Sequence, residues 1–193
     1  MVKKFCVKPM IRPEFRKLLM DQRGAAVILW SFFTISIVIY IVIAHNVLAN
    51  PKYARGLSFA ETARIVLWIL VLVDLGYYFF WKRRYLAPQA ILHSSQKTKL
   101  FRALQEFKGS IEERAAAVVS TFVTRKVVIF AIIEAIAVYG LVLAIVGRYL
   151  LDQYLLSALS LVLLVLEYPT ERFLVGLVQA VEGSAPQLGV KRN

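Results

Sequence analysis

The sequence predicts an all-α integral membrane protein, a bundle of four transmembrane helices with additional amphipathic cytoplasmic helices. Hydrophobic residues make up 59% of the 193 residues and charged residues only 19%, whereas a soluble domain is about half apolar and about a quarter charged. The apolar residues form four blocks, each of roughly 20 residues, the length of helix that crosses ~30 Å of hydrocarbon. We expect helices because each one satisfies its own backbone hydrogen bonds in lipid, and because the blocks lack the alternation of barrel strands.

The four blocks define the predicted spans and the domain boundaries. The spans cover residues 25–49, 62–81, 127–147 and 149–168. The first block is too long for a signal-peptide core, and no small-residue cleavage site follows it, so we expect a permanent helix. The predicted membrane domain is therefore 25–168, which includes a cytoplasmic segment, 82–126. A basic head (1–24) precedes it and a tail (169–193) follows it.

The basic head contains the stretch "RPEFRKLLMDQRG". Pro13 suits the first position of a helix and Gly24 the position after its last turn. Phe15 and Leu18 are spaced to share one face of that helix, with basic residues around them. This pattern predicts a short helix in the cytoplasmic interface, with a solvated basic tail as the alternative.

The segment 82–126 predicts two further helices. Pro88 marks a break after the second span, and an apolar stripe at helical spacing follows it, made of Leu100, Phe101, Leu104 and Phe107. Ser110 and Glu113 then form the S-x-x-E pattern of a capping box. Nothing between Ser110 and Gly147 interrupts a helix, so we expect one long helix that continues into the third span.

Charge asymmetry predicts the orientation. Residues 1–24 carry seven Lys and Arg and the segment 82–126 carries ten, against three in the two remaining loops. The positive-inside rule places both termini in the cytoplasm, as expected of a bacterial inner-membrane protein. The net charge of +12 indicates attraction to anionic lipid head groups rather than to nucleic acid, since no nucleic-acid-binding motif is present. The predicted membrane-surface anchors are Arg16, Lys17, Arg23, Lys82, Arg83, Arg84, Arg125 and Lys126.

Metal and cofactor sites are not expected. Cys6 is the only cysteine, and His45 and His93 fall on opposite sides of the membrane in this topology. Structural and catalytic metal sites need clusters of such ligands. The sequence also lacks the common nucleotide-binding and hydrolase motifs.

Two acids lie at similar depth inside the second and third predicted spans. Asp74 precedes Trp81 by seven residues and Glu134 follows Val127 by seven, so both sit roughly 10 Å inside the cytoplasmic boundary. If the second and third spans pack together, the two carboxyls form a candidate pair that shares a proton. Three interpretations stay open: a structural clasp between helices, a proton- or cation-handling site, or another ligand site.

Small residues recur along the third span beside Glu134. They occur every three or four positions, a spacing that lets another helix approach closely. The predicted helix-packing stripe consists of Ala137, Gly140, Ala144 and Gly147.

The stretch "EAIAVYGLVLAIV" (134–146) resembles the ion-binding helix of the rotor-ring proteolipid of rotary ATPases. The matching positions are Glu134, Tyr139, Gly140, Leu141 and Ala144. The resemblance implies that Glu134 carries a proton or a sodium ion. It does not extend to the rest of the chain, whose first two spans are bulky rather than glycine-rich. In size and layout the chain resembles small four-span membrane proteins of bacteria.

Taken together, these patterns predict a non-enzymatic subunit or scaffold of a membrane assembly. Its expected partners are the anionic bilayer surface and either another protein or further copies of itself. The first alternative is a proton- or cation-coupled membrane protein that uses Asp74 and Glu134. The second is an enzyme of membrane lipids, because the acids and the basic segment lie near the head groups.

Overall fold

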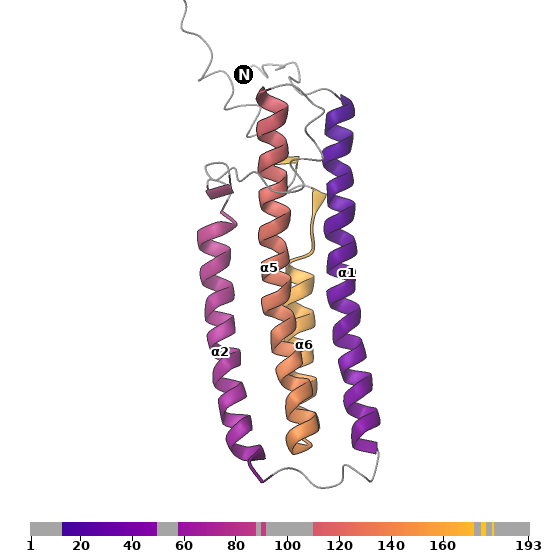
Figure 1. Cartoon of the computed structure of the whole chain (residues 1–193), viewed down its shortest axis with the longest axis vertical. Coiled ribbons are helices and arrows are strands. Elements are labelled where there is room, and N and C mark those ends of the chain that lie inside the picture. The colour runs from indigo at the N-terminus through magenta and orange to yellow at the C-terminus, as the bar shows by residue number, and fades with distance from the viewer. Residues whose placement is uncertain are drawn as a thin grey trace, which may run out of the picture. The chain divides into compact units, whose positions relative to one another are not determined.

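The computed structural model describes residues 13–49, 58–87, 90–91, 110–171, 175–176 and 179. Four long helices account for most of them: α1 (Pro13–Ala49), α2 (Ala60–Tyr85), α5 (Ser110–Gly147) and α6 (Leu150–Leu166) (Figure 1). No strand occurs within these ranges, and the predicted all-α class is confirmed. The apolar stripe predicted as a helix at residues 100–107 lies outside the described residues.

Three of the four helices are long and apolar enough to cross a membrane, at Arg23–Ala49, Ala60–Tyr85 and Ala117–Gly147. The fourth, α6, is apolar but has only 17 residues, about 25 Å of helix. That is slightly less than the ~30 Å of a typical hydrocarbon core. The lengths and composition are those of an integral membrane protein.

Helix α1 begins at Pro13 as predicted but does not end near Gly24. It continues without interruption to Ala49, so the separate interfacial helix expected at the head is wrong. A glycine inside a helix costs only about 1 kcal/mol relative to alanine, and starting a second helix would require a new, unfavourable nucleation. The apolar residues after Gly24 therefore extend the existing helix.

Helices α2 and α5 have chemically distinct ends. Glu61 lies in the first turn of α2 and Lys82, Arg83 and Arg84 lie in its last, which complements the helix dipole at both ends. Helix α5 begins at Ser110 and ends at Gly147, the single long helix that the sequence predicts. Arg148 follows with a φ of 60°, and its N–H donates to the carbonyl of Ala144 at 3.0 Å. This left-handed residue turns the chain directly into α6.

The chain divides into two compact units. The first combines Met1–Ala25, Pro88–Thr124 and Thr170–Asn193. Within it, Arg23 Nη1 lies 3.3 Å from Glu171 Oε2, an ion pair between two partly exposed side chains. The α5 residues of this unit from Ala117 to Val123 are all buried.

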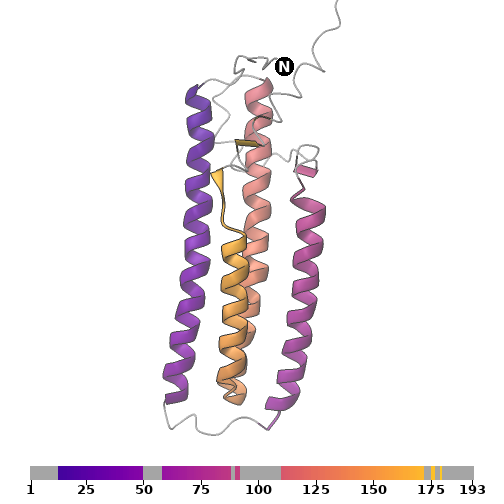
Figure 2. The same ribbon diagram turned by 180° about the vertical axis from the view of Figure 1, so that it is seen from behind.

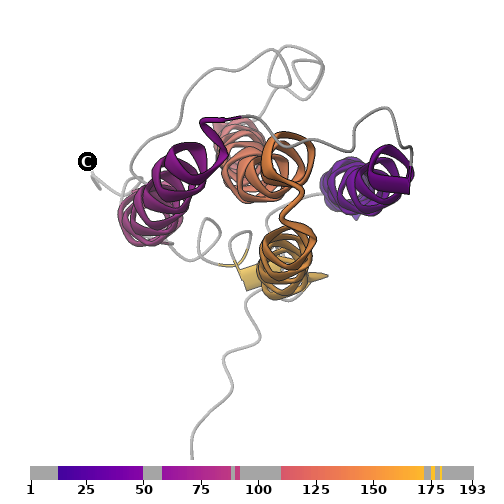
Figure 3. The same ribbon diagram turned by 90° about the horizontal axis from the view of Figure 1, so that it is seen from below.

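The second unit combines Ala26–Ala87 and Arg125–Pro169, and we call it the bundle unit. Its part of α5 lies between α1 and α2, with α6 beside it (Figure 3). From behind, α6 lies in front of α5 (Figure 2). Helix α5 supplies the largest share of the core, including Ile129, Phe130, Ile133, Ile136 and Leu143. Helices α1 and α2 instead expose many large apolar side chains, among them Phe32, Ile35, Ile65 and Leu72, as expected where lipid is the solvent.

Candidate functional site

Glu134 of α5 contacts α1. Its Oε1 accepts hydrogen bonds from Ser36 Oγ at 2.7 Å and from Tyr40 OH at 2.8 Å. Residues four positions apart share a face of a helix, so both hydroxyls point toward the same carboxyl group. A ring contact between Phe33 and Phe130, with centroids 5.8 Å apart, lies in the same helix pair. Glu134 therefore fastens α5 to α1 within the bundle unit.

Asp74 of α2 lies beside Tyr139 of α5, whose phenol interacts with its carboxyl group. The second carboxyl oxygen, Oδ2, is buried without a hydrogen-bond partner. Tyr139 follows Glu134 by five residues, about 140° around the helix axis, so it reaches a different neighbour. The described contacts thus place the two acids on different sides of α5 and do not bring them together. Their equal depth could be estimated from the sequence, but depth does not fix the direction in which a side chain points.

A third acid, Glu167, occupies the end of α6 and is only 3% exposed. Its Oε1 accepts from Lys82 Nζ at 2.5 Å and from Tyr78 OH at 2.6 Å, both on α2. Its Oε2 accepts from Lys126 Nζ of α5, which also donates to the Glu167 carbonyl at 3.2 Å. One carboxylate therefore joins three helices. We call Tyr78, Lys82, Lys126 and Glu167 the lysine–glutamate cluster.

The predicted surface anchors occupy different environments. Lys126 is buried in the lysine–glutamate cluster, with 8% of its surface exposed, so the expectation that it faces head groups is wrong. The residue lies on the face of α5 that packs against α6, and a count of charges along the sequence does not reveal that face. Arg125 donates to the carbonyl of Tyr85 at 2.6 Å, whereas Arg83 and Arg84 are exposed. Arg16 and Lys17 lie in α1, and their side chains are outside the described part of the structure.

A further ion pair lies near the N-terminal ends of α2 and α6, at the other end of these helices from the lysine–glutamate cluster. Arg64 Nε and Nη2 donate to the two carboxylate oxygens of Asp152 at 2.6 and 3.1 Å. The guanidinium also lies over the Tyr149 ring, 4.7 Å from its centroid. Sequence reasoning missed this pair, although an acid in the first turn of one apolar helix and a base in the second turn of another were available as a signal.

The small-residue stripe of α5 faces α6 at Gly140, while Ala137 and Ala144 are fully buried. A Cβ placed on Gly140 would lie 3.2 Å from the Gln153 Cα and 2.7 Å from its Oε1. The facing surface of α6 is polar: Ser160 Oγ donates to the Ile133 carbonyl at 3.0 Å, and Gln153 Nε2 donates to Ser157 Oγ at 3.0 Å. Gly147 instead lies against the ring of Tyr149 in the turn after α5. The stripe therefore allows two helices to meet at close range across a buried polar surface.

The acids described above join one helix to another. Among the residues with described structure, no group of three or more His, Cys, Asp or Glu is placed to hold a metal ion. Each hydrogen-bonded acid of the bundle unit takes its donors from another helix. Comparison with protein-family models, with curated proteins and with solved structures gives no match to this chain.

Proposed function

We propose that this protein is a non-enzymatic subunit or scaffold of a membrane assembly, with both termini in the cytoplasm of a bacterial cell. The observation that carries the proposal is the use of three acids in the bundle unit. Glu134 binds α1, Asp152 binds α2, and Glu167 binds both α2 and α5. The polar groups of the bundle unit thus serve to fix the packing of its own helices.

Such contacts fix the positions of the helices relative to one another more than they add to the stability of the bundle. A hydrogen bond between membrane helices contributes about 1 kcal/mol, but losing one partner of a buried ion pair costs about 3–5 kcal/mol. Any shift of α6 along α5 would break the pairs at both ends of α6, at Asp152 and at Glu167. A bundle fixed in this way can present the exposed apolar faces of α1 and α2 to a partner in a constant geometry.

Purification of the full chain from native membranes tests the proposal. The protein, tagged at Asn193 and extracted in mild detergent, should elute with a partner in fixed stoichiometry, and tagging the partner should recover this chain in return. Two differently tagged copies expressed together distinguish a homo-oligomer from a hetero-complex. A chain that elutes alone as a monomer in several mild detergents, with neither form of association, would contradict the proposal.

A second candidate function is proton or cation coupling by Asp74 and Glu134. It is favoured by the buried, unpartnered Oδ2 of Asp74 and by the two hydroxyl groups that converge on Glu134, because an intramembrane acid is a common proton relay. Proteoliposomes with an internal pH dye would then show a proton flux that Asp74→Asn or Glu134→Gln abolishes while the protein stays folded. A flux that is absent, or unchanged in both variants, excludes this candidate.

A further inference from the structure

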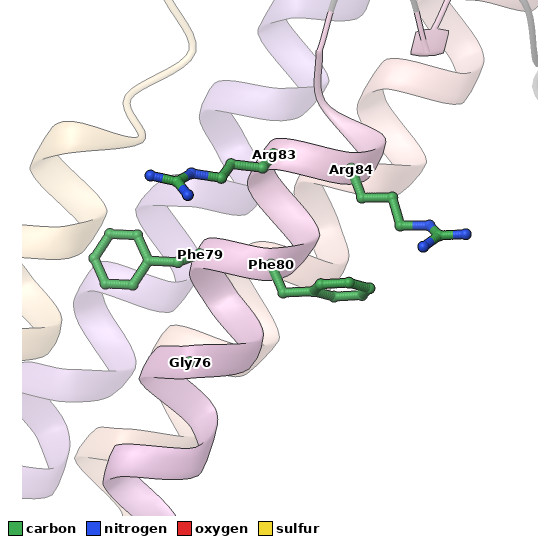
Figure 4. A pocket seen from close by; sticks show the side chains of 5 residues that line it. All are labelled: Gly76, Phe79, Phe80, Arg83 and Arg84. Carbon is green, nitrogen blue, oxygen red and sulfur yellow. The ribbon is translucent and has the colours of Figure 1, made fainter.

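The face of α2 near its C-terminal end carries an open hollow of about 540 Å³. Five residues line it: Gly76, Phe79, Phe80, Arg83 and Arg84. Figure 4 shows Phe79 and Arg83 extending to one side of the helix and Phe80 and Arg84 to the other, with Gly76 below and between the two rings. The hollow therefore has an apolar lower part and a basic upper part.

Helical spacing explains why these five residues share one face. Relative to Gly76 they stand at i+3, i+4, i+7 and i+8, positions that return to the same side of a helix with 3.6 residues per turn. Each ring is followed four positions later by an arginine, so each side of the hollow is an aromatic residue with a guanidinium above it. Nothing lies within 4 Å of a Cβ built on Gly76, which leaves the floor between the rings open.

The two arginines are available to an anion. Both are exposed, and within the described part of the chain neither forms an ion pair with a carboxylate. The Arg84 guanidinium lies 5.7 Å from the centroid of the Phe80 ring and 5.9 Å from that of Tyr85. These contacts hold it beside the helix, and a guanidinium presents its donors in a fixed fork that matches a phosphate group.

The lower part of the hollow suits a hydrocarbon chain. Phe79 and Phe80 are 55% and 49% exposed, although they lie in an apolar helix long enough to span a membrane. The two rings lie on either side of the position of Gly76, which has no side chain to fill the space between them. A second copy of this chain fits the hollow poorly, because a symmetric contact would bring the two arginine pairs together with like charge.

We propose that this face of α2 binds one anionic phospholipid. Its phosphate group lies between Arg83 and Arg84, and one acyl chain runs down over Gly76 between the two phenylalanine rings. The site goes beyond general attraction of a basic protein to the bilayer, because it joins a charge requirement to a shape requirement on a single helix. It does not depend on the proposed scaffold role.

Native mass spectrometry of the full chain, released from nanodiscs of mixed phosphatidylglycerol and phosphatidylcholine, tests the site. We expect one retained phosphatidylglycerol per chain in preference to phosphatidylcholine. The double variant Arg83→Gln/Arg84→Gln should lower that retention at least tenfold. Its control, Lys191→Gln/Arg192→Gln, removes the same two charges from the C-terminal tail and should retain the lipid.

A second pair of variants, one test and one control, examines the shape requirement. Gly76→Leu fills the floor of the hollow and should also lower phosphatidylglycerol retention, whereas Gly24→Leu places the same side chain in open space on α1 and should not. Circular dichroism confirms that each variant is helical before it is compared. Equal retention of both lipids, equal loss in both charge variants, or unchanged retention in Gly76→Leu would each overturn the proposal.

Discussion

Glu167 shows how one carboxyl group can organise three helices. It is buried with Lys126, while the side chain of Lys82 remains 47% exposed and can turn toward water. The two lysines are therefore not equivalent, since the ammonium of Lys126 is paired with Glu167 in a buried position and the side chain of Lys82 is half exposed. This difference predicts that substitutions of Glu167 and of Lys82 change the stability of the bundle by different amounts.

Glu167→Ala should destabilise the bundle by about 3 kcal/mol or more, because it removes the carboxylate that is paired with the buried Lys126 ammonium. Lys82→Met should cost about 1 kcal/mol or less, since Glu167 keeps Lys126 and Tyr78 and the lost partner is half exposed. Equilibrium unfolding in mixed detergent–SDS micelles measures both variants. Equal losses from the two substitutions would show that burial of Lys126 does not control the cluster.

Glu134 gives a second prediction at the same scale. Glu134→Ala removes the acceptor of two hydroxyl groups and should cost about 1–2 kcal/mol of stability, whereas Glu134→Gln keeps an acceptor and should cost less than half of that. Ser36→Ala and Tyr40→Phe complete a double-mutant cycle that isolates the α1–α5 contact. If the alanine variant unfolds at the same SDS concentration as the parent, the contact does not stabilise the bundle.

Helices α5 and α6 come into close contact at Gly140, a residue without a side chain. At Gly140 the neighbouring helix supplies the end of one side chain, the Gln153 Oε1, and two atoms that cannot rotate away, the Gln153 Cα and the Leu156 Cβ. A larger residue must therefore displace the Gln153 side chain and also push α6 away from α5. On that face of α6, Ser160 Oγ donates to the Ile133 carbonyl of α5, and this hydrogen bond depends on the same close approach.

Gly140→Leu should destabilise the bundle by about 1–3 kcal/mol or prevent its folding, because an overpacked helix contact forces the backbones apart. Gly24→Leu is the matched control, since a Cβ there meets nothing within 4 Å and a small gain in helix propensity is expected. Thermal unfolding in detergent compares the two. A Gly140→Leu protein that melts like the parent would mean that α6 does not pack at this position.

The elements could be read from the sequence more reliably than the contacts between them. Continuous apolar blocks and the absence of breakers predicted the helices, and Ser110 correctly marked the start of the longest predicted one. Gly24 was misread because a helix break was inferred from one residue without weighing the helix on either side. The partners of Asp74, Glu134 and Lys126 could not be predicted, because they depend on how each helix is rotated about its axis.

For the whole molecule, the seventeen basic residues of the head and of the segment 82–126 predict a topology with both ends in the cytoplasm. Reporter fusions at Gln96 and Asn193 should give a cytoplasmic signal, and fusions at Asn50 and Arg148 an external one. The Arg148 fusion also tests whether α6, with its 17 residues, returns across the membrane. A cytoplasmic signal at Asn50 would overturn either the number of spans or their orientation.

The turn between α5 and α6 has a consequence for biogenesis. Only Arg148 and Tyr149 separate the two helices, so α6 cannot move far from α5 during translation. On its own α6 is a poor substrate for the translocon, since its buried face carries Asp152, Gln153, Ser157 and Ser160 and polar groups oppose insertion. Against α5 one of these groups finds a partner, since Ser160 Oγ donates to the Ile133 carbonyl, and Gly140 lets α6 pack closely. The two helices should therefore enter the bilayer together as a hairpin. In a glycosylation-mapping assay, α6 alone in a host protein should insert less often than α6 preceded by α5.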